Sequence, residues 1–312
     1  MLKIIVNCGP CEEWIGHCLD SLRSQTWRDW EAFVTVDACG DRTYQQALAA
    51  RRNDPRIFIA KNEQRQYSMR NLVEGIARSN AAPEDVIVCV DGDDWLLHND
   101  SLRIIARTYA SEDCWLTYGS WICNWAHTPG CWPGYPDEAH NFRALDWLGT
   151  AIRTWKKWLW DRIDPVDFRD RHGKYFRVVE DVAAMFPMME MSTIRRMRHI
   201  AEPILFYNRH SNGAAQVMGD EMEENTLWLR SRPRYRAVGG PAEEPSFTSV
   251  LRRASSKEGG PYGQQAEAKT RYDHQRLREH QAGRRMCGSS VHRAQLRPRH
   301  RGRQKEGQEE QE

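Results

Sequence analysis

Apolar runs alternate with segments of helical periodicity over the first part of this 312-residue chain. In residues 11–25, apolar side chains recur at intervals of three and four, as on one face of an amphipathic helix. Alternation of this kind predicts an α/β fold whose mostly parallel, Rossmann-like sheet is flanked by helices on both faces. The expected strands are residues 2–6, 31–36, 56–60 and 85–90, and the expected helices are residues 11–25, 43–52 and 68–78.

The remainder of the chain changes composition twice. Residues 111–165 are rich in Trp, Gly and Pro and show no clear period before about residue 145. Helical spacing returns in residues 181–200, and the apolar residues 204–207 predict a late strand. Arg, Gln, Glu, Gly and Ser dominate after that, and such a segment cannot bury enough apolar surface to offset chain entropy. We therefore predict three parts: residues 1–110, residues 111–230 and a disordered tail of residues 231–312.

Bulk properties exclude some classes of protein. The net charge is +2, from 45 basic and 43 acidic residues, so charge predicts no specific nucleic-acid partner. No apolar run reaches the roughly 18 residues that a membrane-spanning helix needs. The apolar stretch at the start of the chain, MLKIIVNC, is too short for a signal peptide. We interpret it as the first strand of a domain. Nine cysteines without an export signal predict reduced thiols and a cytoplasmic location.

Three aspartates directly follow the strand predicted at residues 85–90. They are Asp91, Asp93 and Asp94, within VIVCVDGDDWL at residues 86–96. The carboxyl ends of parallel strands face the crevice in which open α/β sheets bind ligands. Carboxylates this close repel one another, and a hard divalent cation relieves the repulsion while leaving positions for substrate phosphates. The cluster predicts a metal–nucleotide site, and the alternative is a solvated turn in which Asp94 caps the next helix.

Several motifs occur in the order found in family 2 glycosyltransferases of the GT-A fold. Each motif alone is weak, but the ordered set resembles that family over about residues 1–215. The resemblance implies a GT-A fold with a nucleotide-sugar-binding half in residues 1–110 and an acceptor-binding half in residues 111–230. The motifs are HCLDSLRSQTWRDWE at residues 17–31, FVTVDACGDRT at residues 33–43, Ser68-Met69-Arg70-Asn71, VCVDGDDW at residues 88–95 and Val179-Glu180-Asp181.

The resemblance also implies a reaction. A sugar would move from a nucleotide-diphosphate sugar to a hydroxyl of a glycan or lipid-linked acceptor, with inversion and with Mn²⁺ or Mg²⁺ as cofactor, as in polysaccharide biosynthesis. Tyr207 to Ser211 resembles a late family segment in which His210 would contact metal or phosphate and Arg209 would hold phosphate. The matching positions imply Asp181 as the general base with Glu180 as its substitute, Asp93 and Asp91 at the metal, and Asp37, Arg70, Asp91 and Asp94 at the nucleotide.

Simpler interpretations of these residues stay open. Asp181 stands where a helix is predicted to begin, so its carboxylate could be a helix cap. Arg70 could form a surface salt bridge, and a lone histidine such as His210 is often structural.

Aromatic residues of the second half predict an acceptor site. Trp121 and Trp125 are the candidates, because aromatic faces stack on sugar rings and on apolar lipid parts. The run IRTWKKWLWDRI at residues 152–163 pairs aromatic with basic residues, which could rest on a membrane surface and give a peripheral location. A buried helix explains the same run, and ordinary core packing explains any single tryptophan.

Residues 8–11 read Cys-Gly-Pro-Cys, the spacing of a redox pair. On the resemblance, this stretch is the family's first loop, which borders the nucleotide base. Asn7, Gly9 and Pro10 replace the residues usual there, so the identity of the donor nucleotide is left open. Two alternative functions follow: a non-catalytic nucleotide-sugar-binding protein, or a thiol-disulfide protein acting through Cys8 and Cys11.

Overall fold

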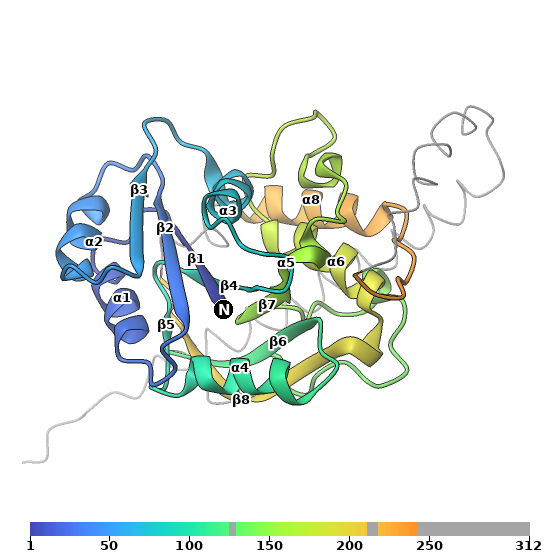
Figure 1. The fold of residues 1–312 in the computed structure, drawn as a ribbon. Helices are drawn as coiled ribbons and strands as arrows, with labels where there is room; N and C mark the ends of the chain where they lie inside the picture. The colour runs from blue at the N-terminus through green and yellow to red at the C-terminus, as the bar shows by residue number, and fades with distance from the viewer. Residues whose placement is uncertain (125–128, 211–217, 242–312) are drawn as a thin grey trace, which may run out of the picture. The chain divides into compact units, whose positions relative to one another are not determined.

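The computed structural model describes residues 1–124, 129–210 and 218–241 (Figure 1). Within these residues, one eight-stranded sheet has the order β3-β2-β1-β4-β7-β6-β8-β5. The first four strands of that order pair in parallel, and β7 runs antiparallel to both β4 and β6. The strands are β1 (Leu2–Cys8), β2 (Trp30–Val36), β3 (Ile57–Lys61), β4 (Val86–Asp91), β5 (Trp95–Leu96), β6 (Leu116–Cys123), β7 (Arg153–Lys156) and β8 (Met197–Tyr207).

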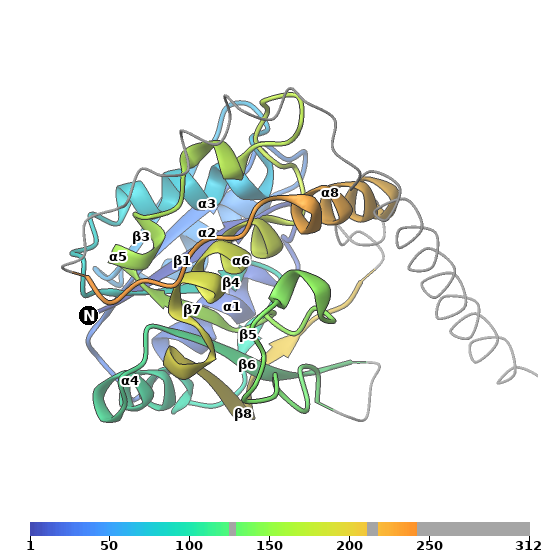
Figure 2. The same ribbon diagram turned by 90° about the vertical axis from the view of Figure 1, so that its right-hand side faces the viewer.

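Helices cover both faces of the sheet (Figure 1 and Figure 2). One buried cluster joins the sheet to α3 and α6, and a second joins its other face to α1, α2 and α4. The predicted α/β fold with a mostly parallel sheet and flanking helices is therefore confirmed. The helices are α1 (Ile15–Arg23), α2 (Thr43–Arg51), α3 (Tyr67–Arg78), α4 (Ser101–Ser111), α5 (Lys157–Trp160), α6 (Glu180–Ser192) and α8 (Gly219–Ser231), with 3-10 turns at Phe142–Ala144, Pro165–Phe168 and Ile194–Arg196.

The predicted elements of the first half correspond to β1, α1, β2, α2, β3, α3 and β4. The later predictions need correction. The helix expected over residues 181–200 ends at Ser192, and Thr193 then has a positive φ of 55° that breaks the helix. The strand expected at residues 204–207 is the end of β8, which begins at Met197 because it pairs in parallel with β6.

Residues 152–163 lie inside the protein, as a strand followed by a short helix. Trp155 is 1% exposed, and Trp158 and Trp160 are also buried. The aromatic side chains that suggested membrane contact therefore belong to the core, and the interpretation as core residues is the correct one. No helix within the described residues has the length and apolarity to cross a bilayer.

Residues after α8 continue along the surface of α6. The Tyr235 backbone N–H donates to Glu190 at 2.9 Å, and the Tyr235 hydroxyl donates to Asp167 at 2.7 Å. The Val238 N–H donates to the carbonyl of Met191 at 3.0 Å. The first residues of the predicted tail are thus bonded to the core, whereas residues 242–312 lie outside the described residues.

Candidate active site

Strand register places the first aspartate of the acidic motif beside a buried arginine. Ile87, Cys89 and Asp91 alternate along β4 and share the face covered by α6, because side chains two apart point the same way. On the antiparallel neighbour β7, Arg153 pairs directly with Cys89. The Arg153 side chain therefore lies on the same face, one side-chain step from Asp91.

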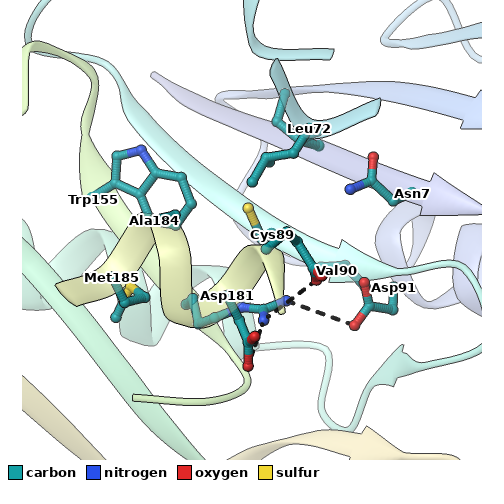
Figure 3. Close-up of a pocket in the computed structure, with 12 residues that line it drawn as sticks. Asn7, Leu72, Cys89, Val90, Asp91, Trp155, Asp181, Ala184 and Met185 are labelled. Carbon is teal, nitrogen blue, oxygen red and sulfur yellow. Dashed lines mark ion pairs between the residues drawn. The ribbon is translucent and has the colours of Figure 1, made fainter. Parts of the chain in front are cut away.

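Arg153 joins three carboxylates from two elements. Its guanidinium lies 3.6 Å from Asp91, 3.8 Å from Glu180 and 3.5 Å from Asp181 (dashed lines in Figure 3). Glu180 and Asp181 are the first residues of α6, so the helix start and the strand end meet at one cation. These residues line a pocket with an empty volume of about 280 Å³. Sequence reasoning predicted the carboxylates but missed Arg153, because the pairing of β7 with β4 is not visible along the chain.

Burial and mutual repulsion shift the pKa values of this cluster. Enclosure in the pocket raises the pKa of Asp91 to about 7, with Glu180 and Asp93 adding to the rise and Arg153 opposing it. Burial, followed by the charge of Asp181, raises the pKa of Glu180. For Arg153, burial opposes the charge, but the neighbouring carboxylates outweigh it and raise the pKa above its usual range. The cluster holds an excess of negative charge around one permanent cation.

Asp181 is held in a defined orientation. Its Oδ2 accepts a hydrogen bond from Trp147 Nε1 at 3.2 Å, and its Oδ1 accepts one from the Val182 N–H at 2.8 Å. The Trp147 ring packs edge-on against Phe186 of the same helix as Asp181. Trp147 is thus a second residue that sequence reasoning missed, since nothing in its local pattern distinguishes it from the other tryptophans.

Asp93 and His210 form the outer end of the site. His210 Nε2 lies 2.7 Å from Asp93 Oδ2, and its ring packs against Trp14 with the ring centroids 4.1 Å apart. His210 Nδ1 is buried and has no hydrogen-bond partner among the described residues. The structure thereby brings together two residues predicted to hold a metal, one after β4 and one after β8.

The surroundings of Asp94 do not support its predicted contact with the nucleotide. It is 1% exposed, and its Oδ1 accepts a hydrogen bond from the Asn208 N–H at 2.8 Å. Asp94 therefore ties the β4 turn to the end of β8. The alternative prediction, a cap on the next helix, is also wrong, because α4 begins after Asp100.

Asp37 and Arg70, which were also predicted at the nucleotide, bond to other residues of the protein. Asp37 is buried, and it accepts hydrogen bonds from Asn62, from the Gln66 N–H and from the Tyr67 N–H at 2.8–3.0 Å. It therefore fixes the start of α3 instead of presenting an open carboxylate to a base. Arg70 forms an exposed pair with Glu74 at 2.7 Å, as the salt-bridge alternative predicted.

Cys8 and Cys11 lie beneath the turn of the acidic motif. Both thiols are free and buried. A Cβ atom built on Gly92 would stand 2.5 Å from Cys8 Sγ and 3.2 Å from Cys11 Sγ, so the turn rests directly on the two sulfurs. A hydrogen bond with Cys11, together with burial, raises the pKa of Cys8 well above its ordinary value. Because thiol–disulfide chemistry needs an accessible thiolate, the structure opposes the thiol-disulfide alternative.

The predicted acceptor residues are only partly described. The Trp121 ring is half-buried, lies 5.1 Å from that of Tyr207, and covers Gly130 so closely that a Cβ there would overlap it. Trp125 lies outside the described residues. Trp147 brings an aromatic ring to the acidic cluster through its bond to Asp181.

Comparison with solved structures defines the fold class. Staphylococcus aureus TarS 1–349 in complex with UDP-GlcNAc is 14% identical, with a TM-score of 0.51 over 68% of this chain and 59% of that chain. Glucosyl-3-phosphoglycerate synthase from Mycobacterium tuberculosis with Mg²⁺ and UDP is 12% identical, with a TM-score of 0.52 over 74% of this chain and 79% of that chain. The same enzyme with Mn²⁺, UDP and phosphoglyceric acid is 11% identical, with a TM-score of 0.50 over 75% and 79%. The fold is therefore a GT-A fold, and the chain spans 59% of the TarS chain it matches.

The family match lies in the first half of the sequence. Residues 4–157 match the model of glycosyl transferase family 2. This part of the chain includes Asp91, Asp93 and Arg153, whereas Glu180 and Asp181 lie beyond it. A search of curated protein sequences finds no significant match.

Proposed function

We propose that the protein is a metal-dependent glycosyltransferase that moves a sugar from a nucleotide-diphosphate sugar to an acceptor hydroxyl with inversion. The observation that carries this proposal is the meeting of the acidic turn after β4 with the acidic start of α6. Asp91 and Asp181 lie 3.6 Å and 3.5 Å from one guanidinium, that of Arg153. A donor bound at the turn would therefore lie close to a base on the helix.

The residues at the outer end fit a divalent cation. Asp93 offers a half-buried carboxylate and His210 an imidazole at 2.7 Å, and both donor types suit Mn²⁺, while carboxylates alone suit Mg²⁺. Within residues 1–124, 129–210 and 218–241, no group of three or more His, Cys, Asp or Glu side chains is arranged to hold a metal. Asp93 and His210 would therefore share the ion with donor phosphates and water. When bound, the ion would neutralise charge on the leaving diphosphate.

Asp181 is the proposed general base. Its carboxylate would accept the proton of the acceptor hydroxyl as that oxygen bonds to the anomeric carbon and the bond to the diphosphate oxygen breaks. Trp147 and the Val182 N–H hold the two carboxylate oxygens, so the base has a fixed direction before the acceptor arrives. A single displacement of this kind inverts the anomeric centre.

The acceptor is proposed to be a glycan or a lipid-linked sugar. Trp147 lies at the base, and a flat aromatic side chain there suits a sugar ring. Trp132 is 60% exposed on the loop between β6 and β7, and its ring centroid lies 5.9 Å from that of His199. Trp121 and Trp125 stay candidate acceptor residues.

A second candidate is a non-catalytic nucleotide-sugar-binding protein. The observation that favours it is the engagement of Asp37 with Asn62 and the start of α3, together with the altered loop at residues 8–11. Such a protein would bind the nucleotide sugar but would not cleave it, so no nucleotide diphosphate would be freed.

Release of nucleotide diphosphate separates the two candidates. UDP- and GDP-sugars are incubated with the full chain, Mn²⁺ and sugar acceptors, and the freed UDP or GDP is measured. Wild-type protein should release nucleotide from one donor class, and Asp181→Asn should lower the rate by about 100-fold or more. The exposed Asp137→Asn variant serves as the matched control and should keep the full rate. Release that is unchanged in Asp181→Asn would contradict the proposed base.

A further inference from the structure

Arg153 lies between the two groups that the proposed reaction uses at its opposite ends. The backbone of β7 fixes its position, because Arg153 to Lys156 pair in register with Val86 to Cys89 of β4. The side chain is 8% exposed and reaches Asp91 at the end of β4 and Asp181 at the start of α6. Any movement of this side chain would therefore act on both ends of the site.

A second buried arginine, Arg143, forms a tightly hydrogen-bonded ion pair with which Arg153 can be compared. Arg143 forms two hydrogen bonds with Glu190, at 2.6 and 3.0 Å, and both side chains are buried. Arg153 instead lies 3.5–3.8 Å from its partners, beyond the 2.7–3.2 Å typical of an N–H···O hydrogen bond. The partners also keep exposed surface, 38% for Asp91 and 22% for Asp181. Arg153 is thus shared among carboxylates that face the pocket.

We propose that Arg153 is the positioning residue of the transfer reaction, holding the donor-side carboxylate Asp91 and the base Asp181 in fixed relation through one buried cation. The inference rests on the proposed function, since it assigns Asp181 as base. Arg153 itself need not touch substrate, because it acts through the two carboxylates.

The charges around Arg153 give this proposal a measurable consequence. Its guanidinium lies within 3.8 Å of Asp91 on β4 and of Glu180 and Asp181 on α6. Without this cation the carboxylates would repel one another, so the base and the donor-side carboxylate should lose their fixed relation.

The test compares Arg153→Met and Arg153→Lys with wild type in the full chain. Initial rates of nucleotide release are measured with the donor that supports turnover. Arg153→Met should lower kcat by about 100-fold and leave the donor KM within about threefold, because the two carboxylates lose their fixed relation while the donor still binds. Arg153→Lys should restore part of kcat.

Arg143→Met provides the matched control, since it breaks a buried pair away from the site. It should lower thermal stability and leave kcat and the donor KM close to those of wild type. If Arg153→Met resembles Arg143→Met in kcat and KM, the proposal is overturned and Arg153 is structural only.

A measurement without donor or metal keeps the inference separate from the proposed function. Adding Asp181→Asn to Arg153→Met removes a carboxylate that has lost its cation, so the double variant should unfold at a temperature about 3 °C or more above the single variant at pH 8. The same Asp181→Asn change should not rescue Arg143→Met. Absence of turnover with every donor would contradict the proposed function, and absence of this rescue would overturn the role of Arg153.

Discussion

Gly92 has no room for a methyl group. An added Cβ would stand 2.5 Å from Cys8 Sγ, 3.1 Å from Cys8 Cβ and 3.2 Å from Cys11 Sγ. Gly92→Ala should therefore force the turn away from β1 and lower the free energy of unfolding by about 1–3 kcal/mol. Chemical denaturation measures this loss. Adding Cys8→Ala should recover part of the stability by removing the nearest sulfur.

Gly40→Ala is the control for this substitution. A Cβ on Gly40 would meet no atom within 4 Å, so the change should shift stability by no more than about 0.5 kcal/mol. Equal stability of Gly92→Ala and Gly40→Ala would show that the sulfurs do not support the turn.

Asp91 should make the metal-free protein less stable as pH rises. Its carboxyl has a pKa of about 7 when folded, against an ordinary value of 3.8 for an aspartate. Between these values the folded chain keeps a proton that the unfolded chain has released, so stability is full below about pH 4 and declines up to about pH 7. The raised pKa of Glu180 acts in the same direction.

The Asp91→Asn variant removes this titration. Its stability relative to wild type should improve steadily from pH 5 to pH 8 in chelator-treated buffer, measured by urea unfolding. Because 38% of the Asp91 side chain is exposed, water screens part of the effect, and the direction of the slope is the prediction. The exposed Asp137→Asn variant should parallel wild type. A parallel curve for Asp91→Asn would contradict the assignment.

Motifs in the sequence predicted the carboxylates of the site but not their partners. Asp91, Asp93, Glu180 and Asp181 stand out because acidic residues follow an apolar strand or open a helix. Arg153 becomes visible only through the pairing of β7 with β4, which lies far along the chain. Asp37 was assigned to the nucleotide from its motif, yet its lone pairs are taken by Gln66 and Tyr67, whose position no local pattern reveals.

At the scale of elements, α6 begins from a strained residue. Val179 precedes the Glu180–Asp181 pair with φ 62° and ψ 27°, the left-handed region that a β-branched side chain rarely adopts. Its side chain is 4% exposed, so packing against the core holds this conformation. The strain fixes the direction from which the acidic pair enters the site.

Glycine should be a better replacement than alanine at this position. Val179→Ala and Val179→Gly both lose buried methyl groups, but only glycine is free of the penalty for positive φ. Val179→Gly should therefore be more stable than Val179→Ala by about 1 kcal/mol, the reverse of the usual order in a helix. Urea unfolding of the two variants measures the difference. A more stable alanine variant would show that the start of α6 relaxes out of the left-handed region.

The elements of the first half could be predicted from periodicity, because the apolar pattern of each element lies within one short stretch of sequence. Their apolar spacing reflects burial on a sheet flanked by helices, and the structure contains all seven. The elements β6, β7 and β8 were missed or shortened because their order in the sheet depends on partners distant in sequence. The tryptophan-rich composition of this region also hides the two-residue alternation of a strand.

At the scale of the whole molecule, one sheet spans the two predicted halves. β4 of the first half pairs with β7 of the second, and β5 returns to pair with β8 at the far edge. The donor-side carboxylates therefore come before residue 110 in the sequence and the base-side carboxylates after it, but both are held by one continuous sheet. We propose that residues 1–110 bind the donor and residues 111–230 the acceptor within this scaffold.

The end of the folded scaffold should lie beyond residue 231. Tyr235 and Val238 bond to Glu190 and Met191 of α6, and Glu190 also pairs with the buried Arg143. A chain ending at residue 241 should therefore be more stable than one ending at residue 231 by about 2 kcal/mol or more, because the shorter chain leaves buried acceptors unpaired. Thermal and urea unfolding of the two chains test this. Equal stability would show that these bonds contribute nothing.

Binding of nucleotide to the full chain tests the central claim most directly. UDP and GDP are titrated by calorimetry with and without Mn²⁺, using wild-type protein and the Asp93→Ala variant. The proposed site predicts binding of one of the two nucleotides that requires Mn²⁺ and is lost in Asp93→Ala. A folded wild-type protein that binds neither nucleotide, or binds one equally well without metal and without Asp93, would contradict the assignment of this site.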